Sequence, residues 1–345
     1  MAMELGIDLG SSKTVIFSNN RVLAEEPTYV TIDEEIGKPV FFGKKAKATL
    51  GRTPVGLCTI SPIKNGIISD IDYTEAMLKS FFGPIFSNRA LRPRIMATLP
   101  AGLTQLQYHS LSNVIENAGG RSVFIIESPL AIACGLGLDF KKPGGTLIID
   151  IGAGSTDVAV VSMGEIVNSN SFPIAGESID KKIAKYIRNE YNVEIGALTA
   201  EQIKIKIGTA VKRNVEIAMP AKGRNVFSGL PEEFEISSTE VFEAIEDTVL
   251  QICNSVRSVL LNTDPDLVGD IIKNGFYITG GVAQLNGLCE FMSDYLGATA
   301  FMPDNPTYSV AIGAAAALKR PELVKNSNYR IRTIKQLTIN NEAQL

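Results

Sequence analysis

The sequence predicts an α/β fold made of two related halves, and three observations support this. Strand-like and helical segments alternate along the chain, which is the pattern of α/β proteins. An apolar strand that runs into Asp-x-Gly and a turn of small polar residues occurs twice, at Asp8 and at Asp150. The 345 residues exceed what one ordinary hydrophobic core holds, so two domains or two fused halves are expected.

Composition and charge narrow the class of protein. Hydrophobic residues make up 45% and charged residues 20%, and the net charge of -4 gives no general electrostatic reason to bind nucleic acid. The four cysteines lack C-x-x-C spacing, which favours reduced thiols in a cytoplasmic protein over a zinc site or disulfides. The sequence opens without a secretory signal, and its longest apolar stretch, 123–138, is interrupted by Glu127 and too short to span a bilayer. We therefore expect a cytoplasmic protein without a nucleic-acid partner.

The first half is expected to open with a strand, a tight turn and a second strand. Residues 5–17 place β-branched and large apolar residues on both sides of a Gly/Ser centre, which is the composition of such a unit. The further elements expected in this half are short strands within 21–62, including 29–32 and 40–42, a turn-rich segment at 62–70, helices at 72–85 and 104–117, strands at 94–99 and 122–126, and an Ala-rich helix at 129–138.

The second half is expected to repeat this order. Residues 146–161 again predict strand, turn and strand, and an aspartate, a glycine and a threonine recur at the same spacing. These residues are Asp8, Gly10 and Thr14 in the first unit and Asp150, Gly152 and Thr156 in the second. The match predicts an internal duplication. The remaining elements expected are helices at 176–193 and 199–218, a hairpin or strand at 226–236, a long amphipathic helix at 239–263, a strand with a Gly-Gly turn at 276–282 and a final Ala-rich helix at 311–319.

Each Asp-x-Gly turn has the features of a phosphate-binding loop. A strand that ends in a turn of small residues leaves backbone N–H groups free to point at an anion, and a phosphate can approach them closely. The aspartate can hold magnesium, usually through water, because magnesium keeps part of its hydration shell. One such loop is equally consistent with an ordinary hairpin turn. Two matched loops and a Gly-Gly turn at 280–281 favour a site for a magnesium-bound phosphate between the halves.

These segments resemble the actin superfamily and, within it, the bacterial actin family MreB. Residues 8–14 match the first phosphate loop, 150–157 match the second, and 279–283 match the last nucleotide turn. The other matching segments are 62–70, 126–133, 176–180 and 199–208. The resemblance runs in order from about residue 4 to about residue 320.

The resemblance implies an actin-like fold, in which two ribonuclease-H-like halves with smaller inserted subdomains surround a nucleotide cleft. Residues 1–141 and about 311–345 would form the first half, with an insertion at about 21–62. Residues 142–310 would form the second half, with an insertion at about 178–246.

ATP or ADP with Mg²⁺ is the cofactor that the resemblance implies, with Asp8 and Asp150 holding the metal through water. Acidic and amide side chains on the helix at 199–208 would suit the ribose hydroxyls, although a solvated helix face would carry the same residues. The implied nucleotide-binding residues are Asp8, Gly10, Ser11, Ser12, Lys13, Asp150, Gly152, Ala153, Gly154, Gly176, Glu201, Gln202, Lys204, Gly280, Gly281, Val282 and Ala283.

The resemblance assigns Glu127 and Ser155 to the hydrolysis of ATP to ADP and phosphate. Glu127 would lie near the γ-phosphate and orient the attacking water, because in-line attack on phosphorus needs a positioned nucleophile more than a strong base. The alternative is that Glu127 caps the helix that begins beside Pro129, since acidic side chains favour helix N-termini. Ser155 stands where the family usually carries threonine, and it keeps the hydroxyl while losing the methyl group.

Other positions depart from the family pattern. Lys13 replaces an asparagine in the first loop, and it would either add positive charge beside the phosphates and slow product release or extend into solvent. Ser128 and Lys206 each replace an acid, and Val282 replaces a third glycine. The expected activity is therefore a weak ATPase whose rate the sequence leaves open.

The partners that the resemblance implies are other copies of the chain, joined head to tail into filaments that pair. The helix at 104–117, with Leu106 near its start, would contribute to the lateral surface, although its apolar residues could equally pack inside their own domain. The loop 88–94 carries Leu91 and three arginines. A weak contact with anionic lipid at the inner membrane face is therefore a hypothesis for this loop.

The leading expectation is an ATP-dependent bacterial cytoskeletal protein that polymerises and supports cell shape or related filament-driven processes. Three other classes are weighed against it. A small-molecule kinase of the same superfamily would need an acid to deprotonate its acceptor, and no extra candidate stands out near the loops. A chaperone ATPase would need a further substrate-binding domain. A scaffold that has lost hydrolysis is kept open by the altered loop residues.

Overall fold

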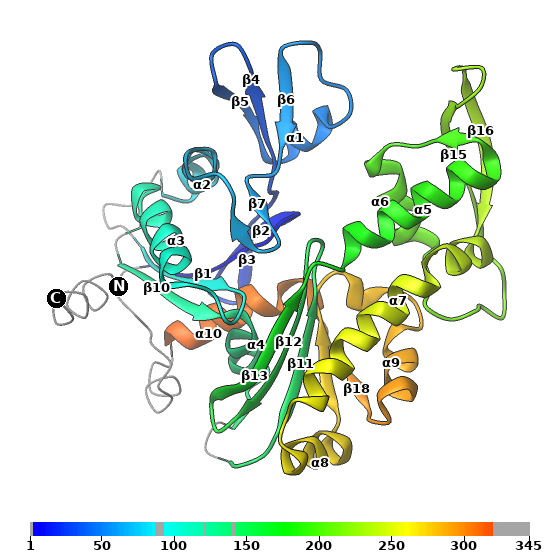
Figure 1. Ribbon diagram of the computed structural model, residues 1–345. Coiled ribbons are helices and arrows are strands. Elements are labelled where there is room, and N and C mark those ends of the chain that lie inside the picture. The colour runs from blue at the N-terminus through cyan, green and yellow to red at the C-terminus, as the bar shows by residue number, and fades with distance from the viewer. Residues whose placement is uncertain (1–2, 87–92, 121, 140–141, 320–345) are drawn as a thin grey trace.

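The computed structural model describes residues 3–86, 93–120, 122–139 and 142–319, and a five-stranded sheet forms the centre of each half (Figure 1). The first sheet contains β1 (Glu4–Leu9), β2 (Lys13–Ser18), β3 (Arg21–Pro27), β9 (Arg94–Leu99) and β10 (Ser122–Glu127). The second sheet contains β11 (Thr146–Ile151), β12 (Thr156–Ser162), β13 (Glu165–Phe172), β17 (Phe276–Thr279) and β18 (Ala300–Phe301).

The two sheets have the same topology. Their strand orders are β10-β9-β1-β2-β3 and β18-β17-β11-β12-β13, so every strand of one sheet has a counterpart in the other. In each sheet three strands form an antiparallel meander, and the other two run parallel to its first strand. Both Asp-x-Gly turns join the first and second strands of a meander. The duplication predicted from the paired motifs is therefore confirmed.

The strands that lead into the two loops also match in burial. Both β1 and β11 have three consecutive buried residues, and the aspartate of each motif, Asp8 or Asp150, occupies the fifth position of its strand. A strand that is covered on both faces buries neighbouring residues in this way. Each aspartate therefore lies at the equivalent position at the end of its own sheet.

Two helices of small residues pack between the halves. These are α4 (Ser128–Gly135) and α10 (Ser309–Lys319). A Cβ atom on Gly313 would overlap the carbonyl oxygen of Ala131, and one on Gly6 would overlap the carbonyl oxygen of Ala311, so both approaches require glycine. A hydrophobic cluster around these helices includes Met96 of the first sheet and Ile148 of the second. The cores of the two halves therefore meet at α4 and α10.

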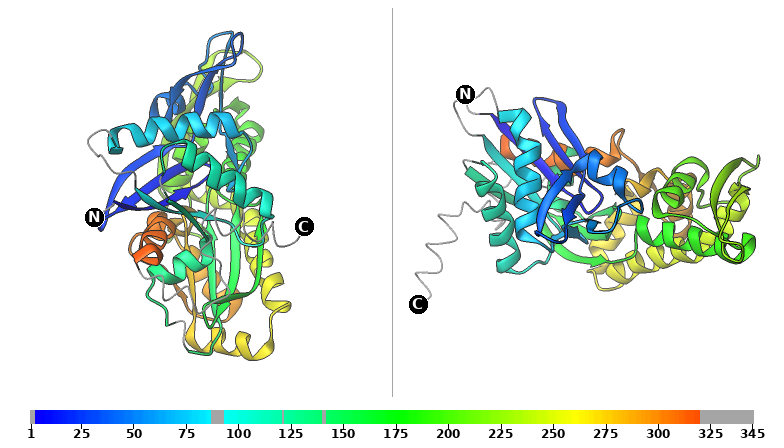
Figure 2. Two further views of the ribbon diagram at one scale, coloured as in Figure 1. Left: turned by 90° about the vertical axis from the view of Figure 1, so that its left-hand side faces the viewer. Right: turned by 90° about the horizontal axis from the view of Figure 1, so that it is seen from above.

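Other helices cover the remaining faces of the sheets (Figures 1 and 2). The first sheet packs against α2 (Ile71–Phe86) and α3 (Gln105–Asn117), and the second half contains α7 (Ser238–Leu261), α8 (Pro265–Asn274) and α9 (Leu288–Leu296). On α3, Leu111 and Val114 are fully buried, whereas Leu106 is 74% exposed. The packing interpretation therefore holds for the two buried residues, and only Leu106 is free for a lateral contact.

Two small subdomains stand beyond the sheets on either side of the cleft (Figure 1). The first contains β4 (Val30–Asp33), β5 (Lys38–Phe42), α1 (Gly43–Thr49) and β6 (Leu57–Ile60), and the hairpin of β7 (Ile63–Lys64) and β8 (Ile67–Ile68) follows it. The second contains α5 (Gly176–Tyr191), β14 (Val193–Glu194), α6 (Ala197–Ile207), β15 (Ala218–Asn225) and β16 (Pro231–Ser237). Because β3 belongs to the main sheet, the first insertion begins only after Pro27. The division of the chain at residues 141 and 142 stays a prediction.

Most of the expected helices are confirmed to within a few residues, but one expected helix is too long and two helices are missed. The periodicity predicts a helix over 199–218, whereas α6 ends at Ile207. Beyond it Thr209 pairs with Asn286, so a tertiary contact draws the backbone out of the helix. The helices α1 and α8 form where no helix is predicted. Helix α1 buries only Gly43 and Ala46, which leaves no apolar periodicity to detect, and α8 buries only Ile271.

The predicted membrane-contacting loop 88–94 lies outside the described residues except for Pro93 and Arg94. The part of the predicted first half at 320–345 also lies outside them. Within the described part of the chain, no helix combines the length and the apolar character needed to cross a membrane.

Candidate nucleotide site

The two predicted phosphate loops have the same local structure. The Gly10 N–H donates to the carbonyl oxygen of Lys13 at 3.1 Å, and the Gly152 N–H donates to the carbonyl oxygen of Ser155 at 2.9 Å. Each bond closes a tight turn directly after β1 or β11. The residues inside the turns are small, namely Ser11 and Ser12 in the first loop and Ala153 and Gly154 in the second. Both turns therefore present backbone rather than bulky side chains to the cleft.

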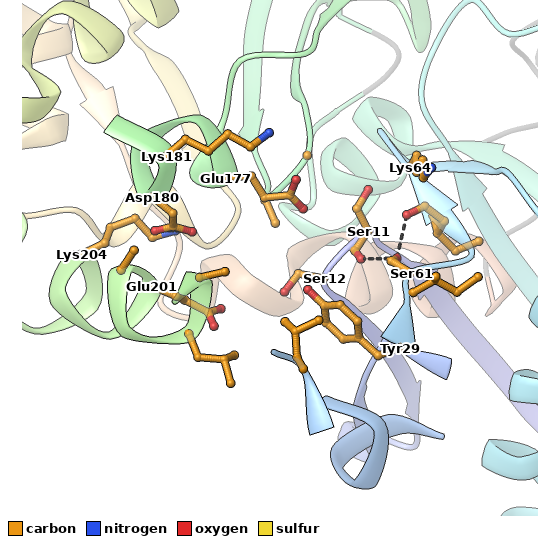
Figure 3. A pocket seen from close by; sticks show the side chains of 18 of the residues that line it. Ser11, Ser12, Tyr29, Ser61, Lys64, Glu177, Asp180, Lys181, Glu201 and Lys204 are labelled. Atoms are coloured by element: carbon orange, nitrogen blue, oxygen red, sulfur yellow. Dashed lines mark hydrogen bonds and ion pairs between the residues drawn. The ribbon is translucent and has the colours of Figure 1, made fainter. Parts of the chain in front are cut away.

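The loops of the two halves meet each other. The hydroxyl of Ser11 accepts the Gly66 N–H at 3.0 Å. The hydroxyl of Ser61 donates to the carbonyl oxygen of Ser11 at 2.9 Å, and Figure 3 shows these two serines side by side. A Cβ atom on Gly154 would lie only 2.9 Å from the Ser11 hydroxyl. The first loop is thus held in place by residues of its own half, and the second loop packs against it. The missing side chain of Gly154 makes this close approach possible.

Both loops line a cavity of 350 Å³ between the halves. The predicted site residues that line it are Asp8, Gly10, Ser11, Ser12, Lys13, Asp150, Gly152, Ala153, Gly154, Ser155, Gly176, Glu201, Lys204, Gly280, Gly281 and Val282. Three predicted residues do not line it: Glu127, Gln202 and Ala283. The cavity therefore brings together residues from every matched segment of the nucleotide site.

The carboxyl groups of Asp8, Asp150 and Asp157 lie on the loop side of this cavity. Burial raises the pKa of Asp8 to about 6, with Lys13 lowering it and Asp157 raising it further. Burial and the charges of Asp157 and Asp8 raise the pKa of Asp150 well above its ordinary value. The pKa of Asp157 is also raised by burial, although hydrogen bonds from Ser171 and Ser155 lower it. A cation between these groups would be stabilised by all three.

The Gly-Gly turn completes the site from the second sheet. Thr279 at the end of β17 pairs with Asp150, so the turn begins beside the carboxyl group of the second loop. Gly280 has a φ of +89°, and a Cβ atom there would lie 2.5 Å from Asp150 Oδ1. Val282 starts a short 3₁₀ helix (η1, Val282–Gln284), and its side chain is buried against Gly176. The valine that replaces the family's third glycine is therefore accommodated without blocking the cavity.

Lys13 lines the cavity and does not extend into solvent, and its place beside the phosphates stays a prediction. Its ammonium group lies 2.7 Å from Glu25 Oε1 on β3 and 4.8 Å from the centre of the Tyr308 ring. The Tyr308 hydroxyl donates to the other oxygen of Glu25 at 2.8 Å. The lysine charge is thus held at the edge of the first loop, where it still lowers the pKa of Asp8.

The two predicted catalytic side chains have partners in the protein. Glu127 occupies the N-cap position of α4, as the alternative predicts, but its side chain makes no capping hydrogen bond. Instead, Glu127 Oε1 accepts the Gly102 N–H at 3.2 Å, from the turn before α3. The Ser155 hydroxyl donates to Asp157 Oδ2 at 2.9 Å. Glu127 therefore lies next to the cavity rather than in it, beside the cavity-lining residue Ser128.

On the adenosine side, α6 supplies two of its three predicted residues. Glu201 lines the cavity and also binds Lys47 of α1 across the cleft, at 2.7 Å. Lys204 forms an ion pair with Asp180 at 2.9 Å and donates to the Gly176 carbonyl oxygen at 3.1 Å. Figure 3 shows Glu201 and Asp180 facing the outer part of the cleft, a cavity of 650 Å³ between the two small subdomains.

Helical spacing explains why Gln202 does not line the cavity. Residues three or four apart share a helix face, so the face of Glu201 also carries Lys204 and Ile205, and both line the cavity. Gln202 follows Glu201 directly and is exposed on another side of α6. Ala283 is likewise displaced, because its side chain is buried in the core of the second half. Spacing from Glu201 could have identified Ile205 from the sequence.

Asp157 is the main site residue that sequence reasoning missed. It lies opposite Asp150 in the β11–β12 pair and lines the cavity. The sequence signal for Asp157 was the tight turn, because the residue seven positions after Asp150 returns beside it on the next strand. In the first half the corresponding partner of Asp8 is Val15, so the duplication offered no second aspartate to compare.

The described residues contain no group of three or more His, Cys, Asp or Glu side chains that could hold a metal ion directly. Burial, and then the charges of Asp157 and Asp8, nevertheless raise the pKa of Asp150 well above its ordinary value. Excess negative charge without a direct ligand set fits a hydrated divalent cation, because magnesium keeps several of its waters in protein sites.

Comparisons with known proteins agree with this geometry. The family profile described as MreB/Mbl protein matches residues 2–326. The cell shape-determining protein Mbl of Bacillus subtilis is 38% identical over 321 residues, which cover 92% of this chain and 96% of that protein. The cell shape-determining protein MreB of Escherichia coli is 36% identical over 323 residues, which cover 92% of this chain and 93% of that protein.

Solved structures show the same fold. MreB 5 of Spiroplasma citri bound to AMPPNP superposes with a TM-score of 0.88 at 32% identity, over 93% of this chain and 97% of that chain. MamK in a double helical filament superposes with a TM-score of 0.77 at 18% identity, over 92% of this chain and 99% of that chain. At that identity the MamK comparison bears on the fold alone.

The duplicated sheets and the cleft between them define an actin-like α/β protein. Within that class, the chain belongs to the MreB/Mbl family, whose Bacillus subtilis and Escherichia coli relatives are cell shape-determining proteins. The family and the fold class predicted from the paired loops are both confirmed.

Proposed function

We propose that this protein binds ATP and ADP in the cleft between its halves. The observation that carries the proposal is the meeting of two equivalent phosphate loops, at Ser11 and Gly154, beside the buried carboxyl groups of Asp8 and Asp150. Spiroplasma citri MreB 5 has been solved both with AMPPNP and with ADP, and the two structures align over 93% and 95% of this chain. These relatives support a nucleotide in the same cleft.

Mg²⁺ accompanies the nucleotide in this proposal. Asp8 and Asp150 would hold it through water, and the metal would supply positive charge to the phosphates. The raised pKa values support this role, since burial disfavours the charged carboxylates and a cation beside them would favour that charged form.

The bound ATP is hydrolysed slowly to ADP and phosphate. Glu127 orients the attacking water. To do so, its side chain has to change rotamer, release the Gly102 N–H and enter the cavity. Ser155 holds a second position at the phosphate end, with its hydroxyl oriented by Asp157. Because positioning dominates phosphoryl transfer, two ordinary side chains of this kind are sufficient for a weak ATPase.

ATP binding drives head-to-tail polymerisation into paired filaments that support cell shape. The support comes from membership of a family with cell shape-determining relatives and from the fold shared with MamK, which was solved as a double helical filament. The exposed Leu106 on α3 would lie on the lateral surface between paired filaments. We place these filaments in the cytoplasm, with a weak attachment of loop 88–94 to the inner membrane face, which co-sedimentation with anionic liposomes would test.

The proposal is tested by pelleting and phosphate release with ATP and Mg²⁺. The wild-type chain should pellet with ATP and release phosphate slowly, and Glu127→Ala should lower phosphate release while sparing ATP binding. Glu116→Ala, at a half-buried acid of α3 outside the cavity lining, is the control and should change neither. A chain that stays monomeric at high concentration with every nucleotide would contradict the filament proposal, and unchanged release by Glu127→Ala would remove Glu127 from the mechanism.

A further inference from the structure

The 350 Å³ cavity lined by both Asp-x-Gly loops, called the phosphate cavity from here on, continues into a further cavity away from the loops. This second cavity measures 270 Å³ and is lined by Lys204, Ile205, Gly208, Arg213, Gly281, Val282, Gln284, Leu285 and Asn286. Five of these residues, Lys204, Ile205, Gly281, Val282 and Gln284, also line the phosphate cavity. The two spaces are therefore one path, which starts at the Asp-x-Gly loops and ends at Arg213 and Asn286.

The wall that carries Arg213 is fixed by contacts with the opposite wall. The Ala210 N–H donates to the carbonyl oxygen of Asn286 at 2.7 Å, and the Thr209 hydroxyl lies 3.1 Å from Asn286 Oδ1. Gly287 adopts a φ of +72° and packs directly against Val211. The segment after Gly208, which is not helical as predicted, is therefore held in place as one wall of the cavity.

Arg213 is incompletely satisfied in this wall. Its Nε atom is buried and has no hydrogen-bond partner among the described residues. Its Nη2 atom reaches the Gly208 carbonyl oxygen only at 3.4 Å. No carboxylate of the described residues forms an ion pair with it, whereas neighbouring Lys204 is paired with Asp180. Since arginine stays charged and no carboxylate of the described residues pairs with it, an acceptor that enters this end of the cavity would bind the guanidinium.

We propose that Arg213 binds the base of the nucleotide, donating a hydrogen bond to a ring nitrogen of the purine, and that it thereby contributes to base recognition. The inference rests on the proposed function, since it needs the phosphates at the Asp-x-Gly loops. With that end anchored, the path leaves the base at the Arg213 end. Purine rings present nitrogen acceptors, and a planar guanidinium can donate to them in the plane of the ring.

The proposal is tested by equilibrium binding of ATP and of 1-deaza-, 3-deaza- and 7-deaza-ATP. Each analogue replaces one ring nitrogen by C–H and keeps the shape of the base and the triphosphate. The wild-type chain should bind one analogue about tenfold more weakly than ATP, as expected for a lost hydrogen bond to a charged donor. In Arg213→Met that analogue and ATP should bind equally, with ATP weakened to the same level.

The matched control is Lys212→Met, which removes a positive charge one residue away. Lys212 is exposed and its ammonium group lies 5.9 Å from the centre of the Phe242 ring, outside the cavity lining. This variant should keep the wild-type order of the analogues. Thermal unfolding without nucleotide should show that both variants fold.

Three results would overturn the inference. One is a wild-type chain that binds ATP and all three analogues equally. Another is an Arg213→Met chain that keeps the wild-type difference among them. The third is an equal loss for ATP and every analogue in Arg213→Met with the wild-type ratios retained, because Arg213 would then act on the phosphates. Failure of the wild-type chain to bind ATP at all would instead contradict the proposed function.

Discussion

Lys47 and Glu201 form an ion pair across the mouth of the cleft, with Nζ 2.7 Å from Oε2 and each side chain about one quarter exposed. The lysine belongs to α1 in the first small subdomain, and the glutamate belongs to α6 in the second. The same glutamate lines the phosphate cavity and is one of the residues on the helix predicted to contact the ribose and base. The pair therefore connects closure of the two subdomains with the group that faces the nucleotide.

Removing this pair should speed nucleotide release. In Lys47→Met the two subdomains lose their link, and we expect ADP to dissociate about two- to fivefold faster, because an ion pair of this exposure is worth at most about 1 kcal/mol. Stopped-flow release of a fluorescent ADP measures the rate. Lys44→Met is the control, since Lys44 is 72% exposed and pairs with Glu26 of the same half. An unchanged release rate in Lys47→Met would show that the pair does not hold the cleft closed.

Asp8→Asn should stabilise the nucleotide-free protein at neutral pH. The pKa of Asp8 is raised to about 6 from an ordinary value of 3.8, so the folded chain binds the extra proton between these values. Stability therefore falls as the pH rises through this window, and the penalty is complete above it. We expect the free energy of unfolding of the variant to exceed that of the wild type by about 1–3 kcal/mol at pH 7.5, and by little at pH 4.

Urea unfolding at the two pH values tests this. Asp294→Asn, an exposed carboxyl on α9, serves as the control and should change little at either pH. The same Asp8→Asn protein should lose the stabilisation that Mg²⁺ and ADP give to the wild type, because the proposed metal-holding group is gone. Equal or lower stability at pH 7.5 would contradict the burial penalty assigned to Asp8.

Gly313→Ala should damage the junction between the halves. An added methyl group would overlap the carbonyl oxygen of Ala131, where α10 crosses α4, and neither helix can move without disturbing a sheet. We expect a loss of about 3 kcal/mol in the free energy of unfolding. Gly269→Ala on α8 is the matched control, since its added methyl group meets nothing within 4 Å and should stabilise that helix by up to about 1 kcal/mol. Equal effects of the two substitutions in chemical denaturation would argue against this packing.

The features that the sequence predicts correctly here have local causes. The loop glycines and aspartates are set by the turns themselves, so Gly10, Asp8 and their counterparts could be found directly. The partners of Lys13 could not, because Glu25 and Tyr308 come from distant segments and only the folded sheet brings them together. The same holds for Arg213, which enters the cavity because pairing of Thr209 with Asn286 overrides the helical periodicity.

Glu25→Gln should tighten the binding of ADP. The hydrogen bonds from Lys13 and Tyr308 hold the pKa of Glu25 below its ordinary value despite burial, so at neutral pH the carboxylate neutralises the lysine. Without that charge, the Lys13 ammonium group acts fully on the phosphates beside it. We expect ADP affinity to rise about two- to fivefold and phosphate release to slow, with a steeper dependence on salt. Tyr308→Phe keeps Glu25 charged and should leave ADP affinity near the wild-type value. An unchanged affinity and salt dependence in Glu25→Gln would mean that Lys13 does not act on the phosphates.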